Sequence, residues 1–193
     1  AEARRLDPNV ATSVEETLLI TGDIERLLAI ETPRLPTGTE QANRVIGLGL
    51  AGRRDEARTQ LQEMRRVFNT GVFETWTSYL SAWLDRRPDG MVFDQSAFGP
   101  LTAYEDPEAV FQEGWLLCDA GDYERGLARL GQAATKGYFG VQTLSSSRQY
   151  DAIRQTAAFQ ALLGSASRGR QEALRVFRDA GGHVVLGMWE RVA

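Results

Sequence analysis

The sequence predicts an all-α fold built from short helices that are joined by tight turns. Apolar residues recur at spacings of three, four and seven, which is the periodicity of amphipathic helices. Alternation with period two, which marks half-buried strands, is scarce. Glycines and small polar residues separate the apolar segments, as expected where one helix ends and the next begins. These three observations favour stacked helices over a fold that contains a sheet.

The apolar pattern divides the chain into five segments, each expected to form a pair of antiparallel helices. Pro33 and Pro36 break the chain after the first pair. Asp106 and Pro107 predict the N-cap and first position of a helix in the fourth pair, and Gly137 predicts its end. The third pair is degenerate, because a stretch rich in proline and glycine follows its first helix. The expected pairs span residues 9–31, 39–68, 72–105, 107–137 and 149–181.

An internal repeat accompanies this division. The stretches TGDIERLL, AGRRDEAR, AGDYERGL and SRGRQEAL each place a glycine before a charged helix start, which predicts a tight turn inside each pair. Their glycines, Gly22, Gly52, Gly121 and Gly169, are 30, 69 and 48 residues apart. Since 69 residues make two units of about 34, a degenerate turn is expected near Arg86. The last separation predicts an insertion around GYFGVQTLSSSRQY.

One unit carries the residues of a known repeat. Residues 107–138, PEAVFQEGWLLCDAGDYERGLARLGQAATKGY, have Gly114 and Ala133 at the small packing positions and Gly121 at the turn. This unit resembles a tetratricopeptide repeat, although Gly126 stands where that family usually has alanine. The resemblance implies a right-handed superhelix of antiparallel helix pairs, a tetratricopeptide-like α-solenoid, that forms one domain over residues 1–193.

The two ends of the sequence add a resemblance of their own. The opening ARRLDPN is similar to the end of a preceding repeat. QYDAIRQTAAFQALL, residues 149–163, resembles the last unit of repeat arrays in bacterial regulatory and signalling proteins. In those proteins the array often follows a kinase, a nucleotide cyclase or a DNA-binding regulator domain. The resemblance therefore implies the C-terminal portion of a longer protein.

The stretch GLGLAG, residues 47–52, matches the dinucleotide-binding spacing G-x-G-x-x-G. A dinucleotide site needs an apolar strand before these glycines, whereas EQANRVI is largely polar. We therefore expect a helix in which Gly47 and Gly49 allow close packing and Gly52 forms the turn. No cofactor is predicted from this stretch.

Composition excludes several classes of function. The formal net charge is -4, which argues against nucleic acid as a partner, since phosphate binding needs concentrated positive charge. No apolar run is long enough for a membrane span, and no signal peptide is visible, so a cytoplasmic location is expected. Cys118 and His183 are the single cysteine and histidine, and Cys118 lies on an apolar helix. We predict no catalytic residue, cofactor or metal site, and hence no enzyme.

Five aromatic residues are the candidate partner-binding site. In tetratricopeptide arrays the first helix of each pair lines a concave groove, and the resemblance would place these residues there: Phe73, Trp76, Trp83, Phe111 and Trp115. Aromatic side chains anchor peptide partners well. The alternative is that they form the core between stacked helices.

Arginines form two clusters, one on each of two predicted helices. Because acidic residues are interleaved with them, salt-bridged, solvated faces are favoured over anion sites. The clusters are Arg53, Arg54, Arg58, Arg65 and Arg66, and Arg168, Arg170, Arg175 and Arg178.

Together these features predict a non-enzymatic scaffold or protein-interaction module of a larger bacterial regulatory or signalling protein. It would dock a peptide, a partner protein or another domain of its parent protein in the concave groove. The alternative is a regulatory domain that senses a small molecule and controls an attached effector domain. An open groove would favour docking, whereas a dry, enclosed pocket lined by Trp76, Trp83 or Trp115 would favour sensing.

Overall fold

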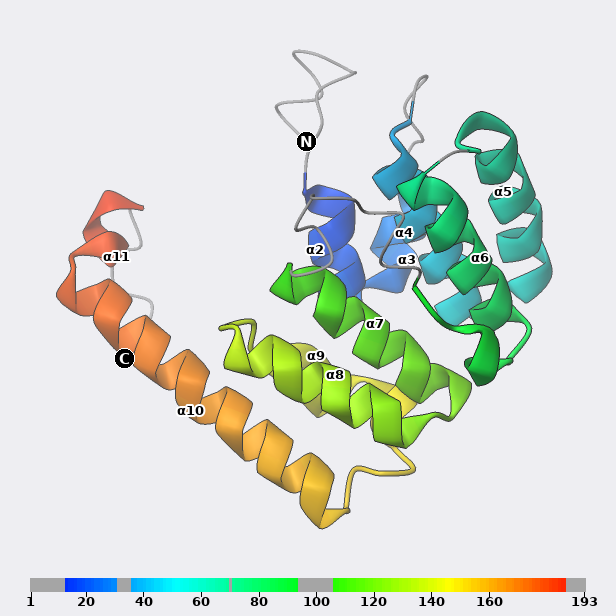
Figure 1. Cartoon of the computed structure of the whole chain (residues 1–193). Coiled ribbons are helices and arrows are strands. Elements are labelled where there is room, and N and C mark those ends of the chain that lie inside the picture. Colours follow the sequence, from blue (N-terminus) through cyan, green and yellow to red (C-terminus); the bar gives the residue numbers. More distant parts are fainter. Residues whose placement is uncertain (1–12, 31–35, 70, 94–105, 187–193) are drawn as a thin grey trace.

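The computed structural model describes residues 13–30, 36–69, 71–93 and 106–186, and Figure 1 shows their arrangement. Over these ranges the chain is helical and contains no strand, which confirms the all-α prediction. The helices are α2 (Val14–Thr21), α3 (Ile24–Ala29), α4 (Gly38–Leu50), α5 (Arg54–Val67), α6 (Val72–Leu84), α7 (Pro107–Ala120), α8 (Tyr123–Thr135), α9 (Val141–Ser146), α10 (Ala157–Asp179) and α11 (Gly182–Val185). Two short 3₁₀ turns, η1 (Pro88–Gly90) and η4 (Arg148–Tyr150), lie between them.

From α2 to α8, consecutive helices pack against one another along the chain. Connections of two or three residues join α2 to α3, α4 to α5, and α7 to α8, so that each of these pairs forms a hairpin. Helices α3 and α4, α5 and α6, and α6 and α7 make the contacts between successive pairs. The interior between the layers is apolar and includes the fully buried Leu19, Ile46, Leu80, Trp83, Phe111 and Trp115.

The inter-helix turns repeat one backbone geometry. Gly22, Gly52 and Gly121 have left-handed φ angles of 78°, 81° and 94°, as the sequence predicts. Arg86 takes the same position in the degenerate turn, with φ 53°, at a cost of about 1–2 kcal/mol for a residue with a Cβ. In each turn this residue and the next donate their N–H groups back to the preceding helix, as in a Schellman motif. The four turns are 30, 34 and 35 residues apart.

GLGLAG lies at the end of α4 and is helical up to its turn. A Cβ atom on Gly49 would lie 2.3 Å from Cη2 of Trp83, and one on Gly47 would lie 2.8 Å from Cδ2 of Leu27. Both glycines therefore let a neighbouring side chain reach the α4 backbone. This confirms the helix, the close packing and the turn that the sequence predicts at this stretch.

Residues 149–181 do not form the expected helix pair. Gly169 lies within α10, a continuous helix of 23 residues that begins at the N-cap Thr156. A Cβ atom on Gly169 would lie 2.1 Å from Cε1 of Phe139, so this glycine accommodates a ring rather than a turn. The helix continues because most of its residues are good helix formers and no proline interrupts it.

The structure describes the expected insertion, but only parts of the first and third predicted pairs. The expected insertion after Gly137 contains α9 and η4. Residues 94–105 of the third segment and 1–12 of the first lie outside the described residues. Of the helices described, none combines the length and the apolar character that crossing a lipid bilayer requires.

The close packing at α4 predicts a large effect of one methyl group. Gly49→Ala should lower the free energy of unfolding by about 1–2 kcal/mol, because the clash with the Trp83 ring outweighs the gain in helix propensity. Gly131→Ala in α8 is the matched control, since no atom lies within 4 Å of its added Cβ, and it should stabilise the protein by about 1 kcal/mol. Urea unfolding followed by circular dichroism measures both changes. A Gly49→Ala protein as stable as the wild type would contradict the packing described above.

Candidate binding cleft

A cleft of about 880 Å³ that is open to solvent lies between segments from both halves of the chain. One wall comes from the α2–α3 hairpin and the C-terminal end of α4. The opposite wall comes from α9 and η4, with Trp115 of α7 beside them. Residues of the first wall include Thr21, Ile24, Glu25, Leu28, Leu50, Ala51 and Arg53, and the second wall adds Trp115, Thr143, Ser146, Ser147, Arg148 and Gln149.

Two hydrogen bonds hold these walls together. Thr143 Oγ1 donates to the carbonyl oxygen of Ile20, and Arg148 Nη2 donates to that of Leu50. Both acceptors lie in the last turns of helices, where carbonyl groups have no partner within the helix. The bonded residues are 123 and 98 positions apart, so the α9–η4 segment closes over the ends of α2 and α4.

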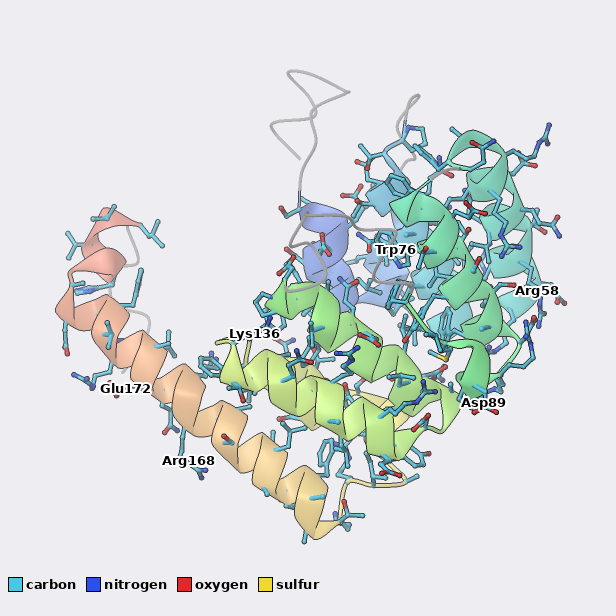
Figure 2. The ribbon with its side chains drawn as sticks, viewed as in Figure 1. Arg58, Trp76, Asp89, Lys136, Arg168 and Glu172 are labelled. Carbon is cyan, nitrogen blue, oxygen red and sulfur yellow. The ribbon has the colours of Figure 1, made fainter. Side chains whose placement is uncertain are left out.

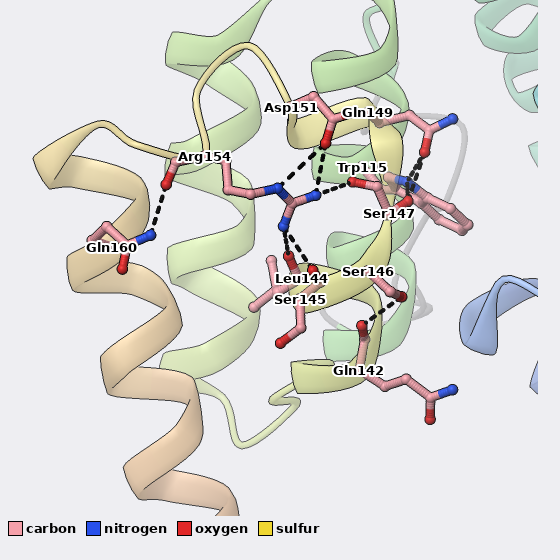
Figure 3. Close-up of polar contacts among 10 residues, drawn as sticks. All are labelled: Trp115, Gln142, Leu144, Ser145, Ser146, Ser147, Gln149, Asp151, Arg154 and Gln160. Carbon is pink, nitrogen blue, oxygen red and sulfur yellow. Dashed lines mark hydrogen bonds and ion pairs between the residues drawn. The ribbon is translucent and has the colours of Figure 1, made fainter.

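Arg154 fixes the conformation of the second wall (Figure 3). Its guanidinium donates to the carbonyl oxygens of Leu144, Ser145 and Ser147, at 3.1, 2.7 and 2.7 Å, and pairs with Asp151 at 2.9 Å. One side chain thus caps the C-terminal end of α9 and orders the chain that follows it.

A second polar chain joins that wall to α7 (Figure 3). The indole nitrogen Nε1 of Trp115 donates to Ser147 Oγ at 3.0 Å, and Ser147 Oγ donates to Gln149 Oε1 at 2.6 Å. Because an indole N–H can only donate, its contact with Gln149 also identifies the amide atom that faces it as the oxygen. The wall therefore presents hydroxyl and amide groups in fixed orientations.

The structure places three of the five predicted aromatic residues in the core. Trp83, Phe111 and Trp115 are 0%, 1% and 2% exposed, which matches the alternative that they pack between helices. Phe73 and Trp76 are half-buried and stacked on each other at 6.4 Å, away from the cleft lining. Trp115 alone among the five lines the cleft, and it does so through a small exposed fraction.

The arginine cluster on α5 has two roles, of which the sequence predicts one. Arg53 and Arg66 form exposed ion pairs, as expected. Arg54 instead donates to Leu84 O at 2.9 Å, pairs with Asp119 at 3.3 Å and lies 5.6 Å from the ring centroid of Trp83. Burial, with neighbouring arginines, lowers the pKa of Arg54. Part of the predicted solvated face is thus a contact between α5, α6 and α7.

Two further arginines of α5 bond the neighbouring helix, whereas the described ion pairs of the α10 cluster are exposed. Arg58 and Arg65 donate to carbonyl oxygens of α6, those of Leu84 and Thr77. Figure 2 shows Arg58 at the outer side of α5, and Arg168 and Glu172 on α10. On that helix Arg175 pairs with Glu172 in an exposed ion pair.

The residues considered for catalysis lie apart from the cleft lining. Cys118 is buried on α7, and burial raises the pKa of its thiol to about 12, so it lacks the thiolate that a nucleophile needs. His183 lies on the short α11. Across the described ranges, no three His, Cys, Asp or Glu side chains gather closely enough to hold a metal ion.

Sequence reasoning missed most of the cleft residues. Thr143, Ser146, Ser147, Arg148 and Gln149 lie in the predicted insertion, whose polar run TLSSSRQ is the signal that sets them apart. Their partners on α2 and α4 are distant in the sequence, so nothing local indicates the pairing.

Comparison with protein-family models, curated proteins and solved structures found no match for this chain.

The contacts of Arg154 predict that lysine cannot replace it. Arg154→Lys should lower the free energy of unfolding by about 2 kcal/mol, because one ammonium cannot reach the carbonyls that the guanidinium bridges. Arg175→Lys is the control, since its pairs with Glu172 and Asp179 are exposed, and it should change stability by less than about 0.5 kcal/mol. Thermal unfolding of the two variants side by side measures the difference. Equal stability of the pair would contradict the capping role.

Proposed function

We propose that this chain is a non-enzymatic protein-interaction module that docks an extended peptide segment of a partner in the cleft between α3 and the α9–η4 segment. The observation that carries the proposal is the cleft's lining, which combines an apolar surface with hydroxyl, amide and guanidinium groups. Peptide recognition uses this combination, because apolar pockets hold side chains while polar groups bond the backbone. The cleft is open to solvent, which leaves room for the parts of the peptide outside it.

The repeated turns support a tetratricopeptide-type array as the scaffold of this module. Four turns share one geometry and are 30, 34 and 35 residues apart, close to that family's unit of about 34. Gly114 and Gly126 lie at a close approach of α7 and α8, where a Cβ on Gly114 would be 2.9 Å from the carbonyl oxygen of Gly126. Such arrays present extended binding surfaces. A role as the docking portion of a larger bacterial regulatory or signalling protein belongs to the same proposal.

A small-molecule sensor is the second candidate, favoured by the cleft's size and its position. A volume of about 880 Å³ falls within the range of ligand pockets, about 300–1,000 Å³. A ligand bound there would contact both the first hairpin and α9. Trp115 in the lining also suits this candidate, whereas the opening of the cleft to solvent favours docking.

Docking is tested with a random peptide library displayed on phage and selected on the purified chain. We expect selected peptides, once synthesised, to shift the NMR signal of the Trp115 indole N–H, which lies at the cleft, and to leave that of Trp83 unchanged. Ala51→Trp places a large side chain at the cleft from an exposed position and should weaken binding by about tenfold or more.

Ala158→Trp is the matched control, because Ala158 is exposed on α10 and outside the cleft lining, and it should bind as the wild type does. Failure to select any peptide, or selected peptides that leave the Trp115 signal in place, would overturn the docking proposal. A small-molecule fragment library screened by the same signal tests the sensor.

A further inference from the structure

We infer that the docked peptide carries an aspartate or glutamate side chain, which binds the free N–H groups of Arg148 and Gln149 at the second wall of the cleft. This inference rests on the proposed function and names the chemistry of the partner.

Two side chains of the second wall have N–H groups with no acceptor among the described residues. A guanidinium carries five N–H groups, and Arg148 uses one nitrogen, Nη2, to bond Leu50 O. Its other N–H groups donate to none of the residues that the structure describes. Gln149 uses its oxygen for Ser147 and Trp115, so its NH₂ group is directed elsewhere (Figure 3), with no acceptor in the described ranges. A ligand that fits these two residues must supply acceptors.

The positive charge of Arg148 favours a carboxylate over a neutral acceptor. Arg53 and Glu25 line the first wall of the cleft, and Arg148 is the charged residue of the second wall. Arg53 already has a bidentate pair with Glu56, at 2.7 and 2.6 Å, whereas no described carboxylate pairs with Arg148. A carboxylate bound at Arg148 would pair the one charge of the second wall, since guanidinium and carboxylate match in shape.

The remaining lining indicates the neighbours of that acid in the peptide. Ile24, Leu28 and Leu50 form the apolar part of the cleft, with the edge of Trp115. An acidic residue flanked by apolar ones would place its carboxylate at the polar wall and its neighbours against this surface.

The experiment compares peptide pairs on two variants of the full chain. Peptides selected from the random library are synthesised with their acidic residue and again with glutamine or asparagine in its place. Wild type should bind the acidic member about tenfold or more tightly, with the difference shrinking as salt rises. Gln149→Glu should remove that preference, because it keeps an oxygen for Ser147 and Trp115 while replacing the NH₂ group by negative charge. Arg148→Lys should retain a weaker preference, since it keeps the charge.

The outcomes separate this inference from the proposed function. Selected peptides with no excess of acidic residues, or pairs that bind wild type equally, would overturn the inference and leave docking intact. A preference for acid that persists in Gln149→Glu would overturn the assignment to this wall. Failure to select any peptide would overturn docking itself. Circular dichroism and the Trp115 indole signal confirm that each variant is folded.

Discussion

Aromatic rings packed against glycine backbones set the spacing of the helices throughout this chain. Phe73 lies on Gly38, Trp83 on Gly49, Phe111 on Gly140 and Phe139 on Gly169, and in each case an added Cβ would overlap the ring. A ring against bare backbone gains dispersion contacts that a side chain in between would prevent. The gain offsets the roughly 1 kcal/mol by which glycine lowers helix propensity at Gly49 and Gly169. The aromatic residues and the glycines are thus one structural feature rather than two.

Arginines supply the second constraint, because they satisfy carbonyl groups at the ends of neighbouring segments. Each helix leaves its last four carbonyl groups without intrahelical partners, and the left-handed turns satisfy only some of them. Arg54 donates to the end of α6, Arg125 to Pro88 and Met91, Arg148 to the end of α4 and Arg154 to the end of α9. A planar guanidinium reaches two or three carbonyls at once, which an ammonium does not. These bonds join layers that apolar packing alone would leave free to slide.

Local chemistry explains which features the sequence predicts. The turns at Gly22, Gly52 and Gly121 follow from residues within a few positions, and so does the cap at Asp106, whose side chain accepts from Glu108 N. Local sequence does not predict the role of Gly169. Its neighbours in the sequence resemble those of a turn, whereas its role depends on Phe139, which lies 30 positions earlier. The orientation of Trp83 and Phe111 depends likewise on which neighbour lies across the layer. Periodicity identifies an apolar face without identifying what covers it.

The cleft depends on contacts that no open array would make. In an open array each repeat touches only its neighbours, so terminal repeats unfold readily and the two ends are independent. Here Thr143 and Arg148 bond the ends of α2 and α4, and α9 also contacts α2. The same segment that closes the chain on itself also provides the polar wall of the cleft. Its shape therefore requires every layer between α2 and η4 to be in place. A ligand that spans both walls would bind only the closed form and so stabilise it, which links binding thermodynamically to the stability of the fold.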